Sequence, residues 1–147
     1  MQPHAAKASS EAQANKMLIA EILRAYGQGD LRPMLAALDD SVTWESHAHK
    51  QHYRFGGPRR GRDSVIEALA MIASEYAIQS YDVKELIAEA DTVWAMSEGV
   101  FLHGATGTRV IFLIATRWGL RDGKIVAYQS FFDTADVLAQ QGRLSGQ

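Results

Sequence analysis

The second half of the chain is a series of strand-like segments separated by short turns, and this pattern limits the possible folds more than any other. Residues 80–88, 92–103, 108–118 and 124–132 are rich in β-branched and aromatic side chains. Asp122-Gly123 suits a tight hairpin turn between the last two segments. Strands connected by such short turns pair with one another in antiparallel fashion.

The first half instead has the residue spacing of helices. Ser10 and Gln13 form a capping box, which predicts a helix that begins at Ser10 and ends at Gly27, with residues 1–9 as a disordered tail. Asp30 can cap a short second helix. Ser64, with a glutamate three residues later, predicts a third helix.

The segments between these helices are expected to be irregular or extended. Residues 39–41 predict a turn, and a strand is expected to begin at Val42. Residues 55–62 contain glycines, a proline and arginines and predict a loop. Asp133 is either a second acidic group of the site or, as the pattern favours, the N-cap of a final helix. Residues 141–147 are expected to be flexible.

Helices followed by hairpin-connected strands predict an α+β fold, in which the helices pack on one face of an antiparallel sheet. One domain over residues 10–140 accounts for the pattern. A strongly bent sheet with helices on its concave side encloses a cavity, and such cavities bind small molecules.

Composition excludes several classes of function. The 147 residues carry a net charge of −2 and no cysteine, so neither nucleic acid nor an anionic membrane is an expected partner, and thiolate chemistry is excluded. The N-terminus lacks the apolar core of a secretory signal, and no apolar run reaches the ~18–20 residues of a membrane helix. A cytoplasmic protein is therefore expected.

The segment Trp44–Phe55 concentrates titratable side chains. In an extended strand, alternation would place Glu45, His47 and His49 on one face. A metal site built from these three is a possible alternative, but they would span about 13 Å along a flat strand and could not converge on one ion. No metal and no cofactor are therefore predicted. His49 and His52 are expected on a loop, and His103 receives no role.

The arginines between Arg54 and Arg62 are a second cluster of charge. They could attract an acidic substrate to the mouth of a cavity, but exposed arginine loops are usually only solvated. The glycines of this segment do not have the spacing of a nucleotide-binding loop.

Three successive segments, YGQGDLRPMLAALDDSVTWE, GPRRGRDSVIEAL and WGLRDGKIVAYQSFFD, resemble the SnoaL-like, ketosteroid-isomerase-like branch of the nuclear-transport-factor-2-like superfamily. The resemblance implies a cone-shaped, cystatin-like α+β barrel with three helices on the concave face of a curved antiparallel sheet. It also implies an open end that admits a small apolar molecule, and often a homodimer formed through the sheet. Function follows less directly, because this fold carries isomerases, cyclases, hydrolases, dehydratases and binding domains.

Site residues can be carried over one at a time. The general-base carboxylate of ketosteroid isomerases corresponds to Glu45, whereas Ile22 and Ala115 occupy the places of the two groups that stabilise the oxyanion. A true ketosteroid isomerase is therefore not expected.

The leading prediction is a cofactor-independent isomerase, cyclase or lyase that acts on a mainly apolar small molecule. Glu45 would move the proton and His47 would assist, and the pocket would be lined by Tyr26, Tyr53, Tyr128 and Phe132. The alternative is a non-catalytic ligand-binding or dimerisation domain of the same fold.

Overall fold

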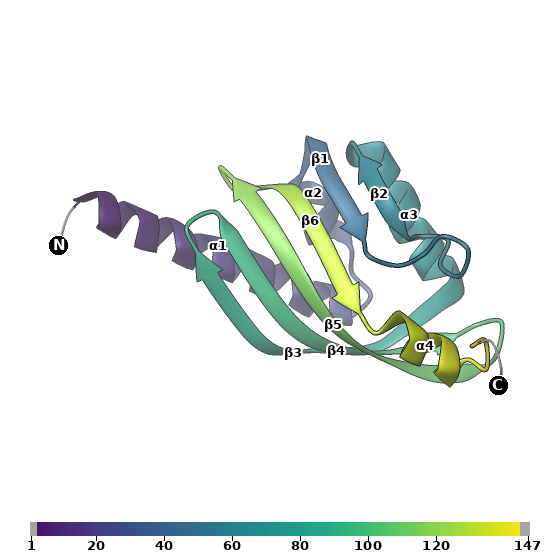
Figure 1. Cartoon of the computed structure of the whole chain (residues 1–147). Coiled ribbons are helices and arrows are strands. Elements are labelled where there is room, and N and C mark those ends of the chain that lie inside the picture. Colours follow the sequence, from purple (N-terminus) through teal and green to yellow (C-terminus); the bar gives the residue numbers. More distant parts are fainter. Residues whose placement is uncertain (1–2, 145–147) are drawn as a thin grey trace.

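A computed structural model describes residues 3–144 of the chain, with side chains from Ser9 onward (Figure 1). Four helices and six strands follow one another in the order α1 (Pro3–Gly27), α2 (Arg32–Ala37), β1 (Leu38–Ser46), β2 (Gly57–Arg60), α3 (Arg62–Glu75), β3 (Tyr76–Glu89), β4 (Thr92–His103), β5 (Thr108–Arg121), β6 (Lys124–Phe132) and α4 (Thr134–Gln140).

The strands form one curved sheet in the order β2-β1-β6-β5-β4-β3. The sheet does not close into a barrel, because its described edges are β2 and β3. Neighbouring strands are antiparallel except for β1 and β6, which run parallel. The long connection between these two strands, which contains the rest of the sheet, permits the parallel pairing. The predicted α+β class with a curved sheet is confirmed.

Helices α1, α2 and α3 cover the concave face of the sheet and lie behind it in Figure 1. The apolar stripe of α1 is fully buried at Ile19, Ile22 and Leu23 and packs against inward-facing residues of the sheet such as Val93 and Trp118. Each such side chain contributes about 1.5–3 kcal/mol on burial. These contacts fix α1 across the concave face of the sheet. The space beyond the C-terminal end of α1 is bordered by other residues.

Several predicted boundaries differ from the structure. Helix α1 begins at Pro3, so the start predicted at Ser10 is wrong: the alanine-rich residues before it favour helix strongly enough to continue it. The predicted turn at residues 39–41 belongs to β1, where a register shift absorbs it. Strand β2 lies within the predicted loop, and β3 begins at Tyr76, directly after α3.

The C-terminal segment is held against the sheet. Asp133 caps α4 by accepting a hydrogen bond from the Asp136 backbone N–H at 2.9 Å, which confirms the capping interpretation. The Gln140 side-chain amide pairs with both the N–H and the C=O of Ile111, each at 2.8 Å. The Gln140 amide therefore provides hydrogen-bond partners for backbone groups of β5 in the part of the strand that extends beyond the end of β6. Residues 145–147 of the predicted flexible end, and residues 1 and 2, lie outside the described residues.

Candidate functional site

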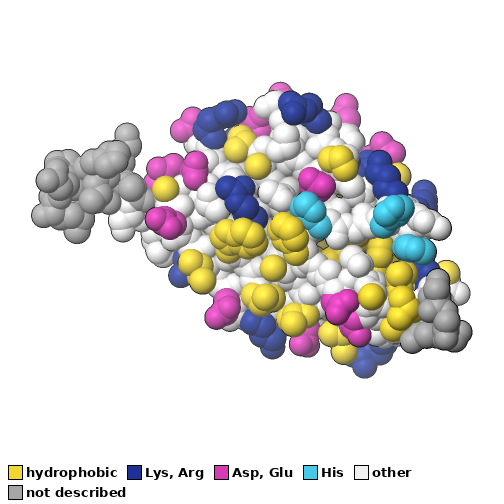
Figure 2. Space-filling model, in the orientation of Figure 1, with side chains coloured by type: hydrophobic (Ala, Val, Ile, Leu, Met, Phe, Trp, Pro, Cys, Tyr) yellow, Lys and Arg dark blue, Asp and Glu magenta, His cyan; other side chains and the backbone are white. Residues whose placement is uncertain are grey.

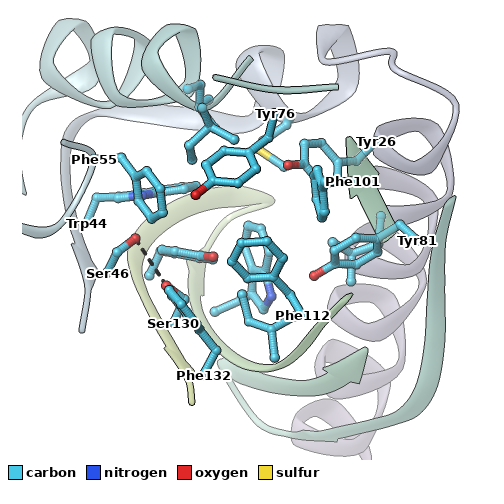
Figure 3. Close-up of a pocket in the computed structure, with 17 residues that line it drawn as sticks. Tyr26, Trp44, Ser46, Phe55, Tyr76, Tyr81, Phe101, Phe112, Ser130 and Phe132 are labelled. Carbon is cyan, nitrogen blue, oxygen red and sulfur yellow. Dashed lines mark hydrogen bonds between the residues drawn. The ribbon is translucent and has the colours of Figure 1, made fainter. Parts of the chain in front are cut away.

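An apolar cavity lies between the concave face of the sheet and helices α1 and α3 (Figure 3). We call it the aromatic cavity, because ten of its seventeen lining residues are Phe, Tyr or Trp. Its volume is about 80 Å³, counted as the space open to the centres of water-sized spheres. This exceeds the ~10–15 Å³ that one water needs on the same measure, so the cavity has room for a small organic molecule.

One wall of the cavity is a stack of aromatic rings. The rings of Trp44 and Tyr128 are 3.7 Å apart between centroids and nearly parallel, and Trp118 meets Tyr128 edge-on at 4.7 Å. Trp44 of β1 and Tyr128 of β6 are register partners, and both face inward. Alternation along β6 places Tyr128, Ser130 and Phe132 on one face, and all three line the cavity.

Four tyrosines line the cavity. The Tyr76 hydroxyl accepts a hydrogen bond from Gln141, and the other three come from three different elements: Tyr26 from α1, Tyr81 from β3 and Tyr128 from β6. Tyr26 makes no hydrogen bond with a side chain or backbone group among the described residues, whereas the Ser97 hydroxyl interacts with Tyr81 and the Ser130 hydroxyl with Tyr128, and each lowers the pKa of the tyrosine. Figure 3 shows Tyr26 and Tyr81 entering from the same side, opposite Ser46 and Ser130. The Tyr26 hydroxyl is therefore free to bind a ligand, while the hydroxyls of Tyr81 and Tyr128 each have a serine hydroxyl beside them.

Burial keeps these tyrosines protonated. It raises the pKa of Tyr81 to about 12, an effect that the neighbouring Ser97 hydroxyl partly offsets. Burial likewise raises the pKa of Tyr26 and of Tyr128 far above the ordinary value, and in both cases the nearby Tyr81 adds to the effect. Near neutral pH each of the three is a hydrogen-bond donor and cannot serve as a base.

Serine hydroxyls are the other polar groups of this region. Ser130 donates to Ser46 at 3.1 Å, and both side chains are buried in the cavity wall. Ser97, beside Tyr81, is fully buried, and its hydroxyl has no hydrogen-bond partner of ordinary geometry among the described residues. The cavity therefore offers hydroxyl groups and aromatic rings, and no charged side chain lines it within residues 9–144.

Glu45 and His47 are on the opposite face of the sheet. In β1 the buried residues Trp44 and Ser46 alternate with Glu45, whose side chain is 39% exposed, and neither Glu45 nor His47 lines the aromatic cavity. The expectation that they form a wall of this cavity is wrong, because the pleat of β1 turns them outward. Their shared face is confirmed: His47 Nδ1 lies 3.8 Å from Glu45 Oε2. Their catalytic roles stay predictions.

The outer position of His47 is well defined. Its Nε2 is 2.8 Å from Gln129 Oε1, and its ring stacks on Phe131 with 4.3 Å between centroids. Glu45 and Gln129 also border a broad, shallow groove on this outer face, together with Thr43, Pro58 and Ala127.

The three further histidines whose side chains are described do not join a site. His49 and His52 lie on the loop after β1, as predicted, with rings 6.3 Å apart. His103 is buried against Tyr76, and burial, together with the charge of Arg143, lowers its pKa. Among the described residues no three His, Asp or Glu side chains gather where a metal could bind.

The predicted substrate-binding tyrosine Tyr53 is buried but does not line the aromatic cavity. Its hydroxyl donates to the Thr134 carbonyl at 2.5 Å and so holds the start of α4. Tyr26, Tyr128 and Phe132 do line the cavity, and their role in binding a substrate stays a prediction.

The arginine cluster makes structural contacts. The Arg59 side chain is only 10% exposed and donates to the Ser64 carbonyl, while Arg62 donates to the Leu35 carbonyl, both at 3.1 Å. These bonds attach β2 and α3 to their neighbours, which leaves the two guanidinium groups less available to a substrate.

Sequence reasoning missed Tyr81, Ser46 and Trp118 as residues of the cavity. Strand alternation offered a signal for Ser46, since an inward Trp44 implies an inward residue two positions later. Tyr81 had no comparable signal, because β3 is irregular: register shifts interrupt its pairing with β4 on both sides of this residue.

The fold has many solved counterparts at low sequence identity. A candidate isomerase from Rhodopseudomonas palustris is 20% identical, with a TM-score of 0.73 over 95% of this chain and 97% of that one. An epoxide hydrolase similar to LEH from M. tuberculosis is 19% identical, with a TM-score of 0.72 over 90% and 92%. IdmH, a candidate polyketide cyclase from Streptomyces antibioticus, is 18% identical, with a TM-score of 0.70 over 87% and 98%.

No curated protein sequence matches the chain. No helix among the described residues combines the length and the apolar character needed to span a membrane. A family model for the SnoaL-like domain matches residues 19–128, a range that contains the C-terminal part of α1, all of α2 and α3, and nearly all of the sheet. The chain therefore belongs to the SnoaL-like domain family, with the nuclear-transport-factor-2-like fold that the resemblance implied.

Proposed function

We propose that the chain is a small-molecule isomerase or cyclase whose reaction takes place in the aromatic cavity, on a neutral apolar substrate that carries a carbonyl or hydroxyl oxygen. One observation carries the proposal: three protonated tyrosines line an apolar cavity whose described lining has no charged side chain, and one of them, Tyr26, has no hydrogen-bond partner among the described residues. A charged substrate would lose its hydration there without a counter-ion, whereas an oxygen atom would satisfy the hydroxyls.

The chemistry follows from the donors. Tyr26, Tyr81 and Tyr128 stay protonated and can donate to a carbonyl oxygen, which favours negative charge that develops on that oxygen. The aromatic walls would hold a flexible substrate in a folded conformation, and a cyclisation gains most from such positioning. An isomerisation, or a ring closure by addition, conserves the atoms of the substrate and its overall oxidation state, so neither consumes an oxidant or a reductant.

The test uses cavity tryptophans as reporters. In a Trp94→Phe background the remaining tryptophans, Trp44 and Trp118, both line the cavity, so binding from a panel of neutral aromatic ketones and phenols should quench their fluorescence. With a converted substrate, Tyr81→Phe should lower kcat by about 10²-fold if this hydroxyl stabilises the transition state. Glu45→Gln should leave kcat within twofold of wild type. An unchanged kcat in Tyr81→Phe together with a large loss of kcat in Glu45→Gln would refute the tyrosine assignment. It would instead support Glu45 as the proton-transfer residue.

A binding domain without chemistry is the second candidate. The absence of a carboxylate or imidazole from the described lining favours it, because the cavity itself then supplies no base near neutral pH. Product analysis separates the two candidates: a ligand that binds with micromolar affinity and is recovered unchanged after long incubation supports the binding domain.

We further propose that the outer face of the sheet forms a homodimer. Large apolar side chains are exposed there and gather over the strands in Figure 2. This outer patch consists of Ile87, Trp94, Leu102, Ile111, Leu113 and Phe131. Apolar patches of this kind on soluble proteins mark interaction sites.

The pairing register of the strands supports a second copy of the chain as the partner that covers the outer patch. One row across the sheet runs from the protruding Ile87 and Trp94 through Arg117 and Gln129 to Glu45. A two-fold axis parallel to the strands at the centre of this row would place the protruding end of one copy over the outer groove of the other. Glu45 and His47 would then be interface residues.

Sedimentation equilibrium tests the dimer. Leu113→Glu should produce monomers, because it buries an unpaired charge in the interface. Met17→Glu is the matched control, since Met17 is an equally exposed apolar residue on α1. A monomeric wild-type protein at micromolar concentration would contradict the proposal.

A further inference from the structure

A second depression lies directly beside the aromatic cavity, at the C-terminal end of α1. It has a volume of about 160 Å³ on the same measure. Its rim comes from the segment between α1 and α2, from α3 and from the start of β3. Five residues line both spaces: Tyr26, Leu69, Ile72, Tyr76 and Phe101. We propose that this depression, which we call the doorway, is the route by which molecules reach the aromatic cavity, and that it passes neutral molecules in preference to ions.

The side of the cavity that α4 covers is closed, which leaves the doorway as the favoured route. Val137 and Leu138 of α4 are buried in the same core cluster as Tyr53 and Phe55. Gln141, just after α4, donates to the hydroxyl of Tyr76 at 2.7 Å. A passage at this end would require these side chains to leave the core, at a cost of several kcal/mol.

Hydrogen bonds reinforce that closed end. The Tyr53 hydroxyl holds the Thr134 carbonyl, and Arg143 donates to the His52 carbonyl at 2.7 Å. The loop after β1 and the C-terminal segment are thereby tied to each other. Opening there would break several bonds at once, each worth about 0.5–1.5 kcal/mol.

The rim of the doorway has little to obstruct it. Gly29, with a positive φ of 79°, has no atom within 4 Å of the position that a Cβ would take, apart from its chain neighbours. Ala73 on α3 is exposed and contributes only a methyl group. At these two positions the rim of the doorway therefore carries no side chain larger than a methyl group.

Phe101 stands between the doorway and the cavity, and its position depends on a neighbouring glycine. A Cβ on Gly99 would lie 2.6 Å from Phe101 Cε2, so the ring occupies space that only glycine leaves free on β4. No charged side chain lines the doorway within the described residues. An ion that crossed it would lose hydration without compensation, whereas a neutral molecule would lose little.

Quenching of cavity tryptophans tests the route without any knowledge of the substrate. In the Trp94→Phe background, acrylamide is the neutral quencher and iodide the charged one. Ala73→Phe places a ring at the rim of the doorway and should lower the acrylamide quenching constant by on the order of threefold. Ala70→Phe is the matched control, because Ala70 is exposed on the same helix but lines neither space. Thermal melts should show both variants folded.

The expected result is slower acrylamide quenching in Ala73→Phe only, with iodide quenching weak in every variant. Equal acrylamide quenching in Ala73→Phe and Ala70→Phe would overturn the proposed route. Iodide quenching as efficient as acrylamide quenching would overturn the preference for neutral molecules.

The inference about substrates rests on the proposed function, so a second arm separates the two. Stopped-flow mixing with 2-naphthol, a neutral aromatic hydroxyl compound, should give association and dissociation rates that both fall in Ala73→Phe, with Kd unchanged. Failure of 2-naphthol and the ketone and phenol panel to bind any variant would contradict the proposed function, while acrylamide would still decide the route.

Discussion

Replacement of Gly99 by alanine adds one methyl group to β4, directed at the rings of Phe101 and Tyr81. Gly99 does not have a positive φ, so an alanine meets no backbone strain there and only space matters. The new Cβ would lie 2.6 Å from Phe101 Cε2 and 3.2 Å from Tyr81 Cδ2, where ordinary contacts begin at about 3.4 Å. The Phe101 ring would have to move by most of an ångström.

That movement has a cost because the ring is held on two sides. Phe101 packs edge-on against Tyr76 and Phe112, at centroid distances of 6.2 and 5.3 Å. Overpacking of this kind costs about 1–3 kcal/mol. For a domain of this size each kcal/mol corresponds to about 2–4 °C in Tm, so Gly99→Ala should lower Tm by roughly 2–12 °C.

Calorimetry measures the loss, and acrylamide quenching in the Trp94→Phe background measures the narrowing of the doorway by the displaced ring. Gly104→Ala is the matched control, because its Cβ would meet only the Glu75 carbonyl oxygen, at 3.7 Å. It should change stability by less than about 0.5 kcal/mol. Equal Tm values for the two variants would refute the packing argument for Phe101.

Three further predictions concern ionisation and capping. Burial raises the pKa of all five tyrosines, and that of Tyr81 to about 12. The pKa of Tyr81 in the folded protein therefore exceeds its unfolded value of 10.0. The stability that protonated Tyr81 contributes is complete below pH 10 and is lost as pH rises through about 12. Absorbance at alkaline pH should therefore show tyrosine ionisation together with unfolding, and a tyrosine that titrates near pH 10 in folded protein would contradict this. Asp133→Ala should cost about 1 kcal/mol through loss of the α4 cap, measured by urea unfolding, whereas Asp63→Ala in the first turn of α3 should cost less. Hydrogen bonds from Arg32 hold the pKa of Asp30 at about 2, below its ordinary 3.8. The contribution of Asp30 to stability is therefore present above pH 3.8 and is lost as pH falls through about 2. Asp30→Asn should flatten that part of the acid unfolding curve, and an unchanged curve would argue against the Asp30–Arg32 contact.

Local patterns in the sequence determined most of the fold, because they report interactions between near neighbours. The hairpin at Asp122-Gly123, the α4 cap at Asp133 and the apolar stripe of α1 each depend on residues within a few positions. The same reasoning failed at β2, whose four residues form a strand only because β1 offers them an edge. Long-range pairing of that kind leaves little trace in a short segment.

One property of the site could not be predicted from local sequence, namely which face of β1 looks into the cavity. Alternation along β1 already implied that Glu45 and His47 share a face and that Trp44 and Ser46 share the other. Which face looks into the cavity depends on the side of the sheet that α1 and α3 cover, and this is decided by burial of their apolar stripes over the whole domain. The tertiary structure turned Trp44 and Ser46 inward, gathered Tyr26, Tyr81 and Tyr128 from three distant segments around them, and left Glu45 and His47 outside. A strand's period of two defines two faces, and only packing against the rest of the chain distinguishes inside from outside.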